Sequence, residues 1–188
     1  MYTESNVKLS CNALWQKCVL ATLYRAAATH PKIKLLQFKL IPYPGMNKAI
    51  PSLMADFTGE LHRLISEYLQ CKRRKDKSVE PTPLYYLWSR EAVANDTTPY
   101  LMVLLLNNDV WCNSRKVVVL RNLIEQAWGK VLDEDNSVTH LVVYPEVLSL
   151  VFDAANTYNA ELGVLEQTAQ AYIESHGAIE RHLGCSDF

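Results

Sequence analysis

Two short apolar segments in the middle of the chain constrain its fold more than any other feature. Residues 84–88 (LYYLW) and 100–106 (YLMVLLL) are rich in leucine and aromatic residues, and prolines and polar residues border them. They are too short for buried helices, so the pattern predicts two neighbouring strands of an antiparallel hairpin. Because both strands are apolar along their whole length, we expect them at the centre of a sheet whose two faces are covered.

The hydrophobic periodicity of the flanking sequence indicates further helices and strands. Helices are expected over 5–29, 53–70, 115–132 and 159–176, and strands over 33–41 and 140–144. Ser52 is expected to cap the second helix, and Val118 to lie on the apolar face of the third. This order contains a β-α-β-β-α-β core, which is typical of ferredoxin-like α+β folds with an antiparallel sheet and helices packed on it. Extra N-terminal and C-terminal helices would flank that core.

Length and composition favour one intracellular domain. A chain of 188 residues with 49% apolar residues can bury one core, so we expect residues 1–30 to form a helix packed on a single domain over 31–188. Neither a membrane-spanning apolar run nor a secretory signal is visible, which predicts a cytoplasmic protein. The five cysteines are odd in number and contain no CxxC pair, so reduced thiols are favoured over a disulfide framework or a zinc site. We expect no metal and no cofactor.

Charge is distributed unevenly along the chain. Residues 1–132 contain 18 lysines and arginines against 10 acidic residues, a balance of +8, whereas residues 133–188 contain 1 against 10, a balance of −9. The asymmetry suggests a basic face and an acidic region that serve partners. An equally open reading is that the acidic end neutralises the basic part within the fold.

One segment concentrates the positive charge at the end of the second expected helix. We predict that these cations, together with Arg90, bind a phosphate backbone. The cations of the segment are Lys72, Arg73, Arg74, Lys75 and Lys77. The competing reading is a solvated helix end, where cations are favourable for the helix dipole.

The aromatic residues of the first hairpin strand allow two readings. Tyr85, Tyr86 and Trp88 could stack bases, as sheet aromatics do in RNA-binding folds. Strand alternation places Tyr85 on the face opposite Tyr86 and Trp88, and aromatics on a central strand more often belong to the core.

Several anchors, in order, resemble the YagK/YfjJ family, also called inovirus-type gene 2 proteins, which occurs in prophages and phage satellites. The anchors are LYYLWSREA, VLLLNND, NLIEQAWGKVL and RHLGCS, and the similarity extends from about residue 35 to 185. This family is similar to rolling-circle replication initiators of the HUH endonuclease type. The resemblance therefore implies an HUH-type version of the antiparallel sheet.

The resemblance also implies where catalytic residues would stand. The two metal-binding histidines would occupy positions 99 and 101, where this chain has Pro99 and Leu101, neither of which can bind a metal. Glu91 stands at the position of an acidic third ligand. Tyr172 stands at the position of the nucleophile, and Ser175 replaces the lysine that follows it in the family. Glu91 and Tyr172 are thus vestigial candidates, and the pattern favours a protein without nuclease activity.

Two classes of function follow from these observations. The first is a catalytically inactive HUH-like protein that binds DNA or RNA as a replication accessory or regulatory factor of a phage-related element. The second is a protein-interaction module in phage defence or counter-defence that uses the acidic region 133–188. Salt-sensitive binding to nucleic acid distinguishes the two.

Overall fold

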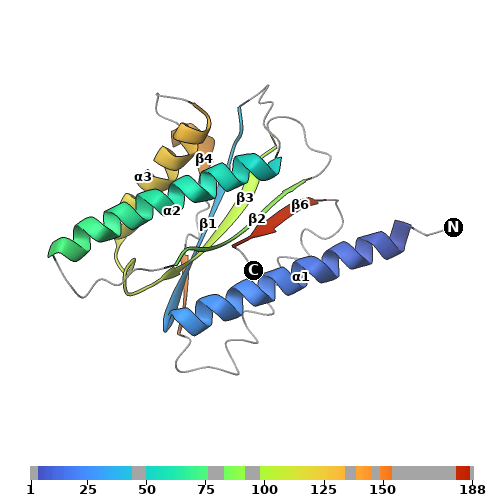
Figure 1. The fold of residues 1–188 in the computed structure, drawn as a ribbon, viewed down its shortest axis with the longest axis horizontal. Helices are drawn as coiled ribbons and strands as arrows, with labels where there is room; N and C mark the ends of the chain where they lie inside the picture. The colour runs from blue at the N-terminus through green and yellow to red at the C-terminus, as the bar shows by residue number, and fades with distance from the viewer. Residues whose placement is uncertain are drawn as a thin grey trace.

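The computed structural model describes residues 4–43, 50–75, 83–91, 98–133, 139–144, 149–153 and 181–186. Figure 1 shows their arrangement as one twisted sheet with long helices packed against it. In chain order the elements are α1 (Glu4–Thr29), β1 (Lys32–Leu40), α2 (Ile50–Lys75), β2 (Tyr85–Glu91), β3 (Tyr100–Asn107), α3 (Ser114–Val131), the 3-10 helix η1 (Thr139–Leu141), β4 (Val142–Val143), β5 (Ser149–Asp153) and β6 (Arg181–Cys185).

The described sheet has six strands and is antiparallel throughout. Its order is β4-β1-β3-β2-β6, and β5 also pairs with β1. Within the predicted hairpin, Tyr85 pairs with Leu105 and Ser89 with Leu101. Both hairpin strands have a neighbour on each side, so the prediction of two interior strands is confirmed. The α+β class and the antiparallel sheet are confirmed with it.

Helices cover both faces of the sheet, which explains why β3 is apolar without alternation. Leu104 and its alternate neighbours on β3 pack into a core with α2 and α3, whereas Val103 and Leu105 pack with Val19 and Leu23 of α1. In Figure 1, α2 and α3 lie side by side and α1 lies apart from them. The prediction that both faces are covered is therefore confirmed.

Four details of the sequence interpretation are wrong. Ser52 is not an N-cap, because α2 begins at Ile50; Pro51 fits the first helical turn, where its missing N–H costs nothing. The strand expected over 140–144 is shorter, since η1 precedes a β4 of two residues.

The two other errors concern exposure and missed strands. Val118 is 54% exposed on α3, outside the core. The strands β5 and β6 were not predicted; β6 is short and contains two basic residues and a glycine, and it forms because β2 offers an unpaired backbone edge. The helix expected over 159–176 lies outside the described residues.

No helix in the described part of the chain is both long and apolar enough to cross a membrane.

Candidate nucleic-acid interface

The C-terminal end of α2 presents the predicted cations to solvent. Lys72, Arg73 and Arg74 are all exposed. The Lys72 ammonium lies 5.5 Å from the centroid of the Tyr68 ring, and Tyr68 stacks on buried Trp111 with ring centroids 5.7 Å apart. The basic end of α2 is therefore held against the segment that leads into α3. The side chain of Lys75 and all of Lys77 lie outside the described residues.

The start of α3, which follows Trp111 closely in the chain, carries two further cations. Asn113 caps the helix, and its side-chain oxygen accepts a hydrogen bond from the Lys116 backbone N–H at 2.9 Å. The first turn holds Arg115 and Lys116 and no acidic residue. A helix N-terminus carries positive partial charge and favours anions, so cations there reduce helix stability by a few tenths of a kcal/mol. Together the helix end and the two side chains form a concentrated positive field that suits phosphate.

A buried lysine on β1 completes this arrangement. Lys34 is only 6% exposed, and its Nζ donates a hydrogen bond to the Trp111 carbonyl at 2.8 Å. Burial lowers the pKa of Lys34, while the nearby Cys112 thiol acts in the opposite direction. The Lys116 Nζ also contacts the Cys112 Sγ at 3.9 Å. The lysines of β1 and α3 thus meet on either side of Cys112.

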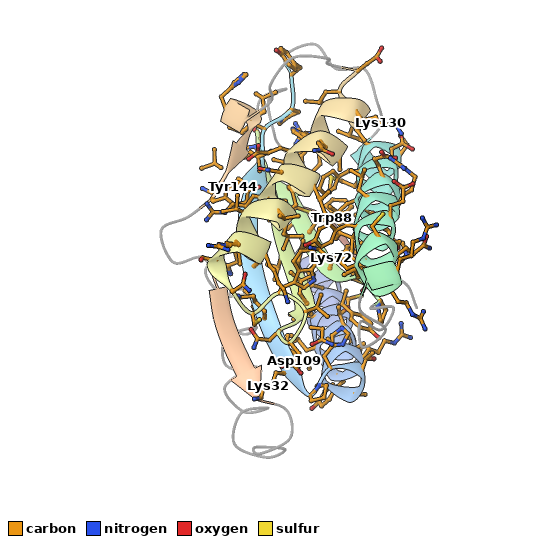
Figure 2. All side chains as sticks on the ribbon, turned by 90° about the vertical axis from the view of Figure 1, so that its left-hand side faces the viewer. Lys32, Lys72, Trp88, Asp109, Lys130 and Tyr144 are labelled. Carbon is orange, nitrogen blue, oxygen red and sulfur yellow. The ribbon has the colours of Figure 1, made fainter. Side chains whose placement is uncertain are left out.

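We call this part of the molecule the basic end, and it comprises Lys34, Lys72, Arg73, Arg74, Arg115 and Lys116. Three elements that are far apart in the sequence meet there. Figure 2 shows Asp109 and Lys32 close together, and the Asn108 backbone N–H donates to the Lys32 carbonyl at 2.9 Å. The sequence interpretation missed Lys34, Arg115 and Lys116. The pattern that could have indicated the last two is a first helical turn with basic residues and no acidic residue.

Elsewhere on α2 and α3, by contrast, cations are neutralised by carboxylates. Glu60 accepts Arg63 Nη2 at 2.6 Å and Lys130 Nζ at 3.0 Å. These partners, the Arg63 hydrogen bond foremost, lower the pKa of Glu60 to about 2. Arg63 also pairs with Glu67. Figure 2 shows Lys130 and Lys72 at different heights along α2, so this ion-pair network is separate from the basic end.

Arg90, the sixth predicted nucleic-acid contact, lies inside the fold. It is 9% exposed. Its Nη1 donates to the Tyr100 hydroxyl at 3.0 Å, its Nε donates to the Thr98 carbonyl at 3.1 Å, and the guanidinium lies 4.7 Å from the Tyr100 ring centroid. Arg90 therefore connects the C-terminal end of β2 to the N-terminal end of β3.

A series of aromatic contacts places Arg90 next to the N-terminal half of α2, far from the basic end. Tyr100 contacts Trp128 at 6.1 Å between ring centroids, and Trp128 contacts Phe57 at 5.6 Å. Phe57 precedes Lys72 by fifteen residues on one continuous helix, which corresponds to about 22 Å. The structure does not bring Arg90 together with the α2 cations.

Positions 99 and 101 and Glu91, which the resemblance to HUH proteins suggested as metal-site positions, lie at this opposite end. Leu101 pairs with Ser89, two residues before Glu91, so these positions are neighbours on adjacent strands. Tyr100, between positions 99 and 101, is buried; burial raises the pKa of its phenol more than Arg90 lowers it. Tyr172 lies outside the described residues. Within the described part, no three His, Cys, Asp or Glu residues are grouped for metal binding.

The aromatic residues of β2 serve packing. Tyr85 faces α1, where its ring meets His30 edge-on at 5.6 Å and its hydroxyl bonds with the Thr29 hydroxyl at 2.7 Å. Tyr86 and Trp88 lie on the opposite face with the α2 core, as alternation predicts. These contacts favour a packing role over a base-stacking platform, because Trp88 is buried and Tyr85 contacts both His30 and Thr29.

A polar groove runs along α2 toward the basic end. It has a volume of about 860 Å³ and lies between the exposed side of α2 and the strands β2 and β6. Its lining is Ala55, Thr58, Gly59, His62, Arg63, Ser66, Glu67, Gln70, Leu84, Tyr86 and Ser186. Gln70 precedes Arg73 and Arg74 by three and four residues, so these two cations follow the groove on the same side of α2.

Comparison with known proteins identifies the family. A model of the YagK/YfjJ C-terminal domain matches residues 13–161, most of the chain. The chain belongs to the YagK/YfjJ family. It is similar to the uncharacterized protein YagK of Escherichia coli (strain K12), with 29% identity over 166 residues that cover 84% of this chain and 78% of that protein. No solved structure matches the chain significantly.

The YagK/YfjJ match includes every residue of the basic end, from Lys34 to Lys116. Tyr172 and β6 lie beyond its last matched residue, 161. The basic end therefore lies within the matched region.

Proposed function

We propose that this YagK/YfjJ protein binds DNA or RNA through the basic end and acts without nuclease chemistry, as an accessory or regulatory factor in replication of a phage-related element. The convergence of cations from β1, α2 and α3 carries the proposal. Exposed Lys72, Arg73, Arg74 and Arg115 present a compact set of donors to phosphate, and the start of α3 adds its dipole.

The groove beside α2 supports a single-stranded ligand in particular. It is open, most of its lining residues carry polar groups, and it leads along α2 from residues 55 to 70 toward Arg73 and Arg74. A strand whose phosphates contact the basic end has its neighbouring nucleotides over Gln70 and Ser66, which offer hydrogen bonds to bases or sugars. Arg63, in the same groove, is already paired with carboxylates and adds little net charge.

A salt titration with a matched pair of variants tests the interface. Each lost phosphate contact reduces the slope of log affinity against log salt by about 0.7 for single strands and about 0.9 for duplex DNA. We expect Arg73→Ala/Lys116→Ala to flatten the slope by roughly 1.4 on single strands and 1.8 on duplex, and to weaken binding to all sequences alike.

The control variant is Lys39→Ala/Lys130→Ala, which removes the same charge elsewhere. Lys39 is an exposed residue near the end of β1, and Lys130 lies near the C-terminal end of α3. We expect the control to keep the wild-type slope. Equal flattening by both variants refutes a localised interface, and absence of salt-sensitive binding at low ionic strength refutes the nucleic-acid function. In that case the alternative proposal, binding of a protein partner by the acidic region 133–188, would be favoured.

The proposal of an inactive HUH-like protein rests on Pro99 and Leu101. Neither side chain can hold a divalent ion, and a phenol that attacks phosphate needs a cation to stabilise the developing charge. Incubation with Mn²⁺ or Mg²⁺ and hairpin DNA is expected to yield no covalent tyrosyl adduct. An adduct that disappears in Tyr172→Phe refutes the inactive reading and leaves the binding interface untouched.

A further inference from the structure

Two cysteines from distant parts of the chain meet between α1 and the sheet. Cys18 lies on α1 and Cys185 is the last residue of β6. Cys185 pairs with Leu87 of β2, and Leu87 belongs to the core on the α1 face. Both cysteines are half-buried and pack against that same apolar cluster, so the two thiols are neighbours between α1 and β6.

This pair differs from the other described thiols. Cys71 and Cys112 are exposed, on α2 and just before α3. Burial, and the neighbouring Cys185, raise the pKa of the Cys18 thiol above its usual value. Cys18 therefore remains protonated near neutral pH and reacts slowly, so the pair persists as two thiols until an oxidant is present.

We propose that Cys18 and Cys185 form a reversible disulfide that fastens α1 to β6 under oxidising conditions. The two thiols are neighbours between α1 and β6, and formation of the disulfide brings the sulfurs to a bond length of about 2.05 Å. The disulfide closes a loop from residue 18 to residue 185, which includes the whole sheet.

The chemistry needs only a peroxide and a dithiol reductant. One thiolate attacks hydrogen peroxide, which gives a sulfenic acid and hydroxide; the second thiol then attacks the sulfenic sulfur, forms the S–S bond and releases water. The two thiols are oxidised and the peroxide is reduced. A dithiol reverses the step by exchange, and its own sulfurs end as the disulfide.

The consequence is a change in how firmly α1 is held. In the reduced protein no covalent bond among the described residues joins α1 to the sheet, which it covers mainly by packing of Val19, Leu23 and Ala26 against Leu87 and Leu105. In the oxidised protein α1 cannot separate from β6. A disulfide that closes so long a loop constrains the unfolded chain strongly, and we expect it to raise the thermal midpoint by roughly 5–15 °C.

The test uses full-length protein in which Cys11, Cys71 and Cys112 are replaced by Ser, so that only the proposed pair remains. Treatment with hydrogen peroxide is expected to give a linked Cys18–Cys185 peptide in non-reducing mass spectrometry, faster migration on a non-reducing gel, and the higher thermal midpoint. A dithiol should reverse all three changes.

Cys185→Ser in the same background is the control. It retains Cys18 and should show neither the faster migration nor the stabilisation. The proposal is overturned if the linked peptide is absent after peroxide has oxidised Cys18 to its sulfinic form, or if the control shows the same changes. Oxidised wild type that links either cysteine preferentially to Cys71 or Cys112 also overturns it.

Discussion

Gly184 offers a sharp test of how β6 packs on the sheet. It lies on β6 opposite Trp88 of β2. A Cβ at this position would stand 2.3 Å from the Trp88 Nε1, 2.5 Å from its Cε2 and 2.7 Å from its Cζ2. We therefore expect Gly184→Ala to be destabilising, although alanine is ordinarily tolerated in a strand.

The magnitude follows from how little room the indole has. The ring is rigid, Trp88 is buried, and its ring meets Tyr100 at 6.2 Å between centroids. Relief requires a movement of the ring or of β6 by about 1 Å, and overpacking of this kind costs about 1–3 kcal/mol. For a chain of this size the thermal midpoint should fall by about 2–4 °C per kcal/mol.

Urea unfolding followed by tryptophan fluorescence measures the effect, and Gly59→Ala is its control. Gly59 lies in the middle of α2, and a Cβ there meets nothing within 4 Å. Because alanine is the better helix former, Gly59→Ala should stabilise the protein by up to about 1 kcal/mol. Trp88→Leu should reduce the cost of Gly184→Ala in a double-mutant cycle. Unchanged stability of Gly184→Ala would refute the placement of Trp88 over β6.

Three further predictions concern buried and paired polar groups. Burial lowers the pKa of His30, so the unfolded chain binds more protons than the folded chain near pH 6.5, and stability falls as the pH falls. His30→Gln should flatten this dependence in urea titrations between pH 7 and 5, and an unchanged dependence contradicts the assignment to His30. The pKa of Glu60 is lowered to about 2, so Glu60→Gln should destabilise the protein by about 1 kcal/mol at pH 7. The difference in stability between wild type and variant should vanish as the pH falls from about 4.5 to 2. A difference that stays constant with pH contradicts the ion pairs of Glu60. Tyr100→Phe should cost about 1–3 kcal/mol in chemical denaturation, because it removes a buried acceptor of Arg90; a neutral effect would show that solvent replaces it.

Local sequence patterns were sufficient for α1, α2, α3 and the central hairpin. The helical spacing of apolar residues in α2 and the polar residues that border the two hairpin strands within 84–106 are local patterns, so they predict these elements directly from the sequence. The basic C-terminal end of α2 was also predictable, since the run of cations at residues 72–77 is local. The edges of the sheet were not, because β5 and β6 lack a strong pattern and form through backbone pairing with β1 and β2.

The candidate site divides in the same way. Residue identity at single positions was enough to show that α2 ends in cations and that Pro99 and Leu101 cannot bind a metal. Which cations lie near one another depends on tertiary packing. Arg90 is buried in the hairpin beside Tyr100, far from Lys72, and Lys34 contacts the Trp111 carbonyl close to the start of α3. Contacts between residues far apart in the sequence arise from how the sheet and helices pack, and periodicity does not encode them.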